Sequence, residues 1–118
     1  MSEWLFNSKG TPCLILDGIY IRNDHGYVAS WIFGPNVHSS KGEHIGWVEG
    51  GVFYDIQNRP ILFTRNHTAY LPTKPGLTGT RSMPGFASPP GRPGVIGTKG
   101  RPGLSQSWST YNPPDYFK

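Results

Sequence analysis

The stretch Asn7-Ser8-Lys9-Gly10 is the first of four copies of one turn pattern, and the copies are spaced 16 residues apart. The later copies are Asn23-Asp24-His25-Gly26, Ser39-Ser40-Lys41-Gly42 and Asp55-Ile56-Gln57-Asn58. The first side chain of each copy can accept hydrogen bonds from backbone N–H groups two or three residues further on. The last residue is Gly or Asn, both of which tolerate positive φ. Such a pattern is typical of a type I turn that closes a β-hairpin.

A second turn pattern follows each first one by eight residues. Its copies are Asp17-Gly18, Phe33-Gly34, Glu49-Gly50 and Arg65-Asn66, and Gly or Asn again fills the position that needs positive φ. Two turns in every repeat leave two short strands, and no helical period competes over the first 67 residues. We expect twelve apolar side chains to form one buried face: Leu5, Ile21, Val37, Phe53, Cys13, Ala29, Ile45, Ile61, Ile15, Trp31, Trp47 and Phe63.

The sequence therefore predicts an all-β fold of four 16-residue β-hairpin repeats, an eight-stranded antiparallel meander over residues 1–69. A meander with two free edges is prone to pair with other chains. Closure around a pseudo-fourfold axis, as a flower or a barrel, removes both edges and is the arrangement that we expect. The alternative is an open meander that is stabilised by the rest of the chain or by a second copy.

Three segments also resemble a known family. They are Trp4-Leu5-Phe6-Asn7-Ser8-Lys9-Gly10, Ile45-Gly46-Trp47-Val48-Glu49-Gly50 and Val52-Phe53-Tyr54-Asp55, which are similar to the small bacterial proteins described as four-fold β-flowers. The resemblance covers residues 4–67, and the basic, proline-rich remainder that ends in aromatic residues is similar too. The third repeat departs from the pattern with Pro35-Asn36, which puts the order of its first strand in question. The resemblance implies a fold and no activity, so no functional residue is carried over from it.

Charge and composition divide the chain of 118 residues into unlike parts. Residues 1–69, here called the head, have a net charge of −1, whereas residues 70–118, here called the tail, have a net charge of +5 and hold nine of the twelve prolines. The tail divides further into a Gly/Pro-rich segment at 70–104 and an aromatic C-terminal segment at 105–118. A basic appendage on a near-neutral body is common among proteins that bind polyanions, and common also in solvated tails.

The tail has a period of three, with Gly or Ser at every third residue from Gly76 to Gly103. Proline often precedes these small residues, a pattern typical of an extended polyproline II-like helix. A disordered tail fits the same composition, and Ser82 and Ser88 argue against a collagen-like trimer, which needs Gly at its axis. A flexible linker does not need a strict glycine phase. We therefore expect the glycine side to face an aromatic surface or another copy, so that substitution of Gly94 or Gly97 by Val would disturb the packing.

Three groups of side chains are candidates for binding. The first consists of strand aromatics that could dock a polyproline II segment: Trp4, Phe6, Tyr20 and Tyr54. The second consists of C-terminal aromatics that could anchor the tail on the head or form a linear motif for a partner: Trp108, Tyr111, Tyr116 and Phe117. The third consists of tail cations that could contact a polyanion: Arg81, Arg92, Lys99 and Arg101.

The sequence offers little for catalysis, metal binding or cofactor binding. No two of its histidines are spaced two residues apart, as a pair of ligands on one strand face would be. Cys13 occupies a core position, and the chain contains no nucleophile elbow, phosphate loop or dinucleotide fingerprint. We expect no enzyme activity, no cofactor and no metal.

The chain also contains no apolar run long enough to span a membrane and no recognisable signal peptide, so the expected location is the cytoplasm. The predicted function is a protein-interaction or structural module whose tail docks on its own β domain, on other copies or on another protein. The alternative is binding of RNA or single-stranded DNA through the basic, aromatic-ended tail.

Overall fold

The computed structural model describes residues 2–95 and 97–117, which form eight strands and one short helix. In chain order these elements are β1 (Ser2–Phe6), β2 (Pro12–Asp17), β3 (Tyr20–Arg22), β4 (Val28–Phe33), β5 (Asn36–Ser39), β6 (His44–Glu49), β7 (Val52–Asp55), β8 (Pro60–Phe63) and α1 (Pro113–Tyr116). The third repeat forms β5 in full, so Pro35-Asn36 does not disturb its first strand.

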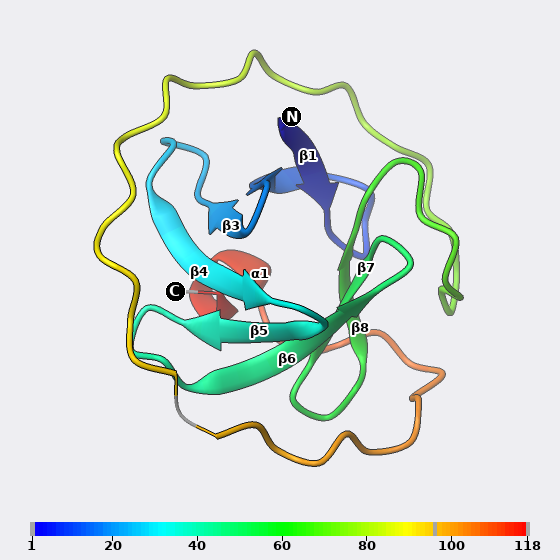
Figure 1. Ribbon diagram of the computed structural model, residues 1–118. Coiled ribbons are helices and arrows are strands. Elements are labelled where there is room, and N and C mark those ends of the chain that lie inside the picture. The colour runs from blue at the N-terminus through cyan, green and yellow to red at the C-terminus, as the bar shows by residue number, and fades with distance from the viewer. Residues whose placement is uncertain (1, 96, 118) are drawn as a thin grey trace.

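The eight strands pair with their neighbours in sequence order, all antiparallel, and β8 returns to pair with β1. The predicted eight-stranded meander in four hairpin repeats is therefore confirmed, and the sheet is a closed barrel (Figure 1). Because β8 pairs with β1, neither terminal strand is a fully free edge. The closing contact is short, a single residue pair between Phe6 and Phe63.

The first side chain of every first turn accepts backbone hydrogen bonds as predicted, but the donors are two and four residues further on and not two and three. Asn7 Oδ1 accepts from the N–H groups of Lys9 and Thr11, and the side chains at 23, 39 and 55 accept from the corresponding pairs. The closing residues of these turns, Gly10, Gly26, Gly42 and Asn58, all have positive φ. Among the described residues Asn58 is the one non-glycine residue in that region, so the same expectation for Asn66 was wrong.

The prediction of a single buried face was wrong for a third of its members, because each repeat contains a β-bulge. In the first repeat Leu5 pairs with Leu14 and Phe6 pairs with Pro12, which leaves Cys13 as the extra residue. A bulge shifts the side-chain alternation by one residue. Four predicted core residues, Ile15, Trp31, Trp47 and Phe63, therefore lie on the outer face of the barrel, and Leu14 and Leu62 join the inner cluster instead.

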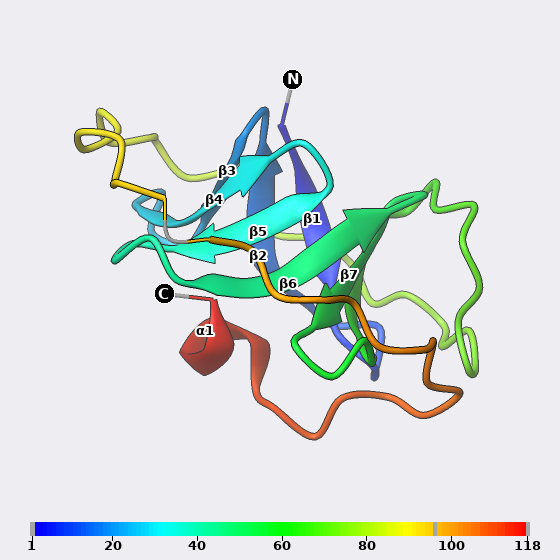
Figure 2. The same cartoon turned by 60° about the horizontal axis from the view of Figure 1, so that its bottom comes forward.

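The tail runs around the outside of the barrel and ends across one of its open ends (Figure 1). Figure 2 shows α1 beneath the barrel, where Phe117 enters the inner cluster with no exposed surface and its ring centre lies 6.4 Å from that of Phe53. Helix α1 has four residues, and no helix among the described residues is long enough to cross a membrane.

Candidate interaction surface between tail and head

The tail meets the head at the first turn of each repeat, and it does so at steps of nine residues. Three backbone hydrogen bonds make this contact: Thr78 N–H to Gly10 O at 3.0 Å, Ala87 N–H to Gly26 O at 3.2 Å and Ser105 N–H to Asn58 O at 3.2 Å. The position that corresponds to these donors in the third repeat is residue 96, which lies outside the described residues. The contacts therefore follow the pseudo-fourfold symmetry of the head.

The turn glycines are needed for the close approach of the tail. A Cβ atom added to Gly10, Gly26 or Gly42 would lie well under 3.0 Å from a tail carbonyl oxygen, that of Gly76, Gly85 and Gly94 respectively. In the fourth repeat Asn58 replaces glycine and makes a hydrogen bond instead, from Nδ2 to Pro102 O at 2.9 Å. The first three tail carbonyls thus come from equivalent glycines, and the fourth comes from the proline that precedes the equivalent Gly103.

The tail sequence contains a nine-residue repeat that the period of three had concealed. Its copies begin Pro75-Gly76-Leu77, Pro84-Gly85-Phe86, Pro93-Gly94-Val95 and Pro102-Gly103-Leu104. Each copy is Pro-Gly followed by an apolar residue, and each lies beside one first turn of the head. The signal was available in the sequence as a recurrence of this triplet.

The expected orientation of the tail glycines was wrong. A Cβ added to any tail glycine, Gly94 and Gly97 included, would meet no atom within 4 Å. The tail approaches the head with its backbone carbonyl and N–H groups, so the residues that must lack a side chain are on the head. Substitution of a tail glycine is consequently not expected to disturb the packing.

Two of the four predicted docking aromatics contact cations of the tail. Trp4 is 7% exposed and donates its Nε1–H to Arg81 O at 3.1 Å, and the Arg81 guanidinium lies 5.1 Å from the centre of its ring. The Arg101 guanidinium lies 5.0 Å from the ring centre of Tyr54. An arginine over an aromatic face is an attractive cation–π arrangement, so these two rings lie at the interface between tail and head.

The other two predicted docking aromatics, Phe6 and Tyr20, make contacts with residues of the head. Phe6 is stacked on Phe63, and Arg65 lies over its ring at 5.5 Å. Tyr20 makes an edge contact with Trp31, with ring centres 5.0 Å apart. These two aromatics support the outer face of the barrel.

The four tail cations proposed for a polyanion lie along the outside of the barrel. Besides Arg81 and Arg101, Arg92 lies 4.3 Å from the ring centre of Phe33. Arg101 also pairs with Glu49 at 2.8 Å. The side chain of Lys99 is exposed, and its backbone N–H contacts the head.

Arg22 joins head to tail and was not recognised from the sequence. It is 4% exposed, and its Nε donates to Asp17 Oδ2 at 2.8 Å. Its Nη1 donates both to Gly26 O at 2.7 Å and to Ala87 O at 2.8 Å, and its guanidinium lies 4.6 Å from the ring centre of Phe86. The signal in the sequence was a charged residue at the position that Phe, His and Tyr occupy in the other repeats.

His38 and His44 lie side by side beneath the part of the tail that contains Lys99, with ring centres 5.2 Å apart. His44 Nδ1 accepts a hydrogen bond from Lys99 N–H at 2.8 Å, so its proton is on Nε2. His38 Nδ1 faces the carbonyl of Gly42 at 3.1 Å and is therefore the protonated nitrogen of that ring. Because His44 Nε2 carries a proton, the two rings are not arranged as a pair of metal ligands. Burial lowers the pKa of His44.

The C-terminal aromatics divide between two places. Trp108 lies on the outer face, where its ring centre is 6.0 Å from that of Phe63 and its Nε1–H donates to Thr73 Oγ1 at 3.0 Å. Tyr111, Tyr116 and Phe117 gather at the barrel end that α1 covers, and the rings of Tyr111 and Tyr116 are stacked with centres 4.8 Å apart.

The Tyr116 hydroxyl connects this end of the chain to strand β6 and to the turn after β7. It accepts from Ile56 N–H at 2.8 Å and donates to Ile45 O. Burial raises the pKa of Tyr116 to about 12, so the hydroxyl keeps its proton. Burial also raises the pKa of Cys13 to about 12, which keeps that thiol protonated and unreactive.

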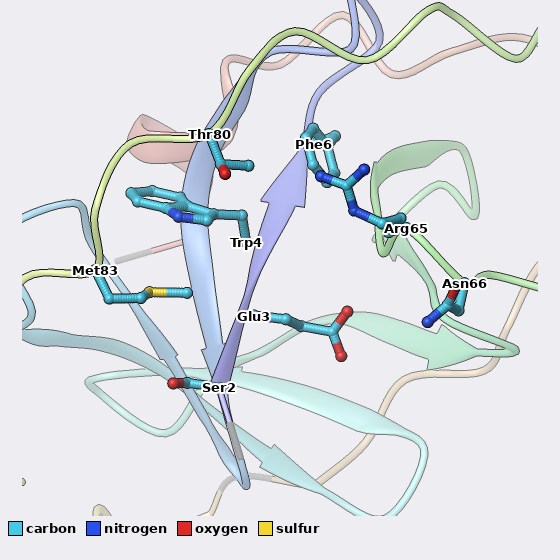
Figure 3. A pocket seen from close by; sticks show the side chains of 8 residues that line it. All are labelled: Ser2, Glu3, Trp4, Phe6, Arg65, Asn66, Thr80 and Met83. Atoms are coloured by element: carbon cyan, nitrogen blue, oxygen red, sulfur yellow. The ribbon is translucent and has the colours of Figure 1, made fainter.

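An opening of about 370 Å³ lies beside β1, between the strand and the tail (Figure 3). It is lined by Ser2, Glu3, Trp4, Phe6, Arg65, Asn66, Thr80 and Met83. Its walls combine aromatic side chains with one acidic and one basic residue.

Comparison with known proteins gives one match. A family model described as "4-fold beta flower protein" matches residues 3–117, which includes the tail as well as the barrel. No curated protein and no solved structure matches.

Proposed function

Because the chain belongs to the 4-fold β-flower proteins, we propose that it is a non-enzymatic interaction or structural module whose tail docks on its own β domain. The observation that carries the proposal is the agreement between two unequal repeats. A nine-residue step in the tail meets a 16-residue step in the head, through equivalent backbone groups at the three turns where the tail donor is described. A tail that served only as a flexible tether would have no use for this agreement.

The outward surface of the docked tail supports an interaction role. Phe86, Val95 and Leu104 follow the Pro-Gly of successive nine-residue units and are 38%, 48% and 49% exposed. Exposed apolar side chains at regular positions offer contacts to a protein partner. In this proposal the head holds the tail in place, and the docked tail presents these side chains to a partner at fixed positions around the head.

The nucleic-acid alternative has weaker support. Arg81, Arg92 and Arg101 lie over aromatic rings of the head, and Arg101 is also paired with Glu49. Phosphates would have to compete with these contacts, and bases would have to compete for the same rings.

Amide hydrogen exchange on the full chain tests the proposal. The N–H groups of Thr78, Ala87 and Ser105 should exchange at least about tenfold more slowly than those of Gly79 and Gly91, which have no partner of this kind. Fluorescence anisotropy with single-stranded RNA at low salt should show no binding. Unprotected donors, together with RNA binding that weakens steeply as salt rises, would favour the nucleic-acid alternative instead.

A further inference from the structure

Each repeat of the barrel pairs with the next through one strand–strand interface, here called a seam. Three of the four seams are well paired, and one is almost unpaired and is here called the open seam. The seams are β2–β3, β4–β5, β6–β7 and β8–β1. The first three contain three, four and four residue pairs, whereas β8–β1 contains the single pair Phe6 and Phe63. The fourth seam is also the one without a connecting turn, because it joins the two ends of the meander.

The 16-residue repeat identifies which residue pairs are missing from the β8–β1 seam. In the β6–β7 seam Val48 pairs with Phe53 and Glu49 pairs with Val52. The equivalent pairs in the β8–β1 seam would be Thr64 with Leu5 and Arg65 with Trp4, and neither is formed.

The chain leaves the seam because it turns back onto another part of the head. His67 N–H donates to Thr64 O at 3.3 Å, and Thr68 N–H donates to Gly50 O at 2.7 Å. These bonds draw residues 65–68 towards the β6–β7 turn and away from β1.

The backbone of Trp4 faces the open seam. In the third repeat Val48 N–H donates to Pro35 O, away from β7, so its neighbour Glu49 directs its own backbone groups towards β7. Thr64 N–H likewise donates to Gly51 O, away from β1. In a fully paired seam Arg65 would therefore pair with Trp4. The opening beside β1 lies where the backbone of that paired residue would be.

Figure 3 shows how the opening is bordered. Trp4 and Met83 lie on one side of β1, whereas Glu3 points to the other side, towards Arg65 and Asn66. An unpaired strand edge beside apolar side chains is the arrangement that binds peptides by strand addition.

We propose that the open seam binds an extended peptide of a partner protein, which adds as an antiparallel strand and pairs with the backbone of Trp4. The peptide would carry an apolar side chain beside Trp4 and Met83, and an acidic residue on its amino-terminal side beside Arg65. This proposal names a partner surface for the interaction role and rests on that role. Antiparallel pairing is expected because every pair in the sheet is antiparallel.

A peptide fits this place better than a second copy of the chain does. The opening of about 370 Å³ accommodates a few residues of one strand. A second copy would have to bring its own β1, which is paired with β2 on one side and flanked by Thr80 and Met83 of its own tail.

Short synthetic peptides provide the test on the full-length, ¹⁵N-labelled protein. The probe is an N-acetylated, C-amidated peptide of sequence Asp-Thr-Val-Thr-Val-Thr, and one control has Lys in place of Asp. Two further controls carry an N-methyl group on alternate residues, so that one blocks an N–H that faces β1 and the other an N–H that faces solvent. We expect the Asp peptide to shift the amide signals of residues 2–6 and to slow exchange at Trp4 N–H, and one N-methyl control to bind about tenfold more weakly than the other.

The charge of Arg65 provides a second readout. Arg65→Glu should reverse the preference so that the Lys peptide binds more tightly, whereas the same charge change at the exposed Lys74 should leave the preference unaltered. Equal binding of the two N-methyl controls, shifts confined to other parts of the molecule, or no shift at millimolar peptide would each overturn the proposal. So would protection of Trp4 N–H that rises with protein concentration alone, because a second copy would then fill the seam. Protection of Thr78, Ala87 and Ser105 is measured in the same spectra and reports separately on the docking of the tail.

Discussion

Substitution of Gly26 by Ala tests the docking of the tail most directly, because the chain contains a matched control. Gly26 has φ +88°, and a Cβ there would overlap the carbonyl oxygen of Gly85. Gly34 has φ +62°, and a Cβ there would meet no atom within 4 Å. Both substitutions place alanine in the left-handed region, at a cost of about 1–2 kcal/mol. The difference between them therefore isolates the contact with the tail.

The contact at Gly26 includes several interactions that would be lost together. The added methyl group displaces Gly85, and with it the hydrogen bond from Ala87 N–H to Gly26 O and the hydrogen bond from Arg22 to Ala87 O. The Phe86 ring would also leave the Arg22 guanidinium. Two hydrogen bonds at about 1 kcal/mol each and one cation–π contact at about 0.5–1 kcal/mol amount to roughly 2–3 kcal/mol.

Thermal unfolding followed by circular dichroism measures this difference. Gly34→Ala should lower the melting temperature by several degrees, and Gly26→Ala should lower it by roughly 8–12 °C more. Hydrogen exchange at Ala87 N–H should accelerate in Gly26→Ala alone. If the two variants lose the same stability and Ala87 exchanges equally fast in both, the tail does not rest on this turn in solution and the reasoning fails.

Three further predictions follow from single contacts. Burial lowers the pKa of His44 below the unfolded value of 6.5, so its contribution to stability is complete above that pH and is lost as the pH falls from 6.5 through the folded pKa. Urea unfolding at a series of pH values should show this pH dependence flattened in His44→Gln, and an unchanged dependence would contradict the prediction. Tyr116→Phe removes a hydroxyl that is hydrogen-bonded to two backbone groups and should lower the free energy of unfolding by about 1–3 kcal/mol in the same assay. Tyr111→Phe changes an exposed ring and should alter the free energy of unfolding by less than about 0.5 kcal/mol. Gly94→Ala should shift the melting temperature by no more than about 2 °C, because its Cβ points into open space; a loss as large as that of Gly26→Ala would contradict the orientation of the tail.

The hairpins of the head could be predicted because their determinants are local. A side chain such as Asn7 accepts bonds from N–H groups two and four residues on, and Gly10 supplies the positive φ, so the turn is encoded within a few residues. Four copies at one identical spacing then fix the number of strands and leave few ways to arrange them. Closure followed from the cost of free edges.

The assignment of side chains to the two faces failed because a bulge leaves no local mark in the sequence. Cys13 and Ile15 are two residues apart and were placed on one face by simple alternation. The structure inserts an extra residue at Cys13 and sends Ile15 outward. An outer face this apolar is stable in water only if something covers it. The segment that covers it lies far along the chain, 45 residues from Phe63 to Trp108 and 77 residues from Trp4 to Arg81. Local patterns carry no information about such a cover.

The two repeat lengths of the chain are related by the size of the barrel. From Gly76 to Gly103 the tail advances 27 residues and passes all four first turns, which is three quarters of a circuit. At ~3.1 Å per residue an extended chain of this length covers roughly 84 Å, the arc of a circle of radius roughly 18 Å. The molecule measures 37 × 36 Å across its two long axes, and the tail forms its rim (Figure 1).

A step of nine residues is therefore the one that satisfies both conditions on the tail. An extended chain with three residues per turn presents the same side to the head only when the step is a multiple of three. Six residues per repeat would give a circle of radius roughly 12 Å and twelve would give roughly 24 Å. Neither matches a rim whose diameters are 37 and 36 Å. A step of nine places a tail carbonyl against every first turn and, at the three turns where the donor is described, a tail N–H as well. The period of three in the tail thus lets every nine-residue step present the same side of the tail to the head. The number of three-residue periods in one step is set by the radius of the barrel.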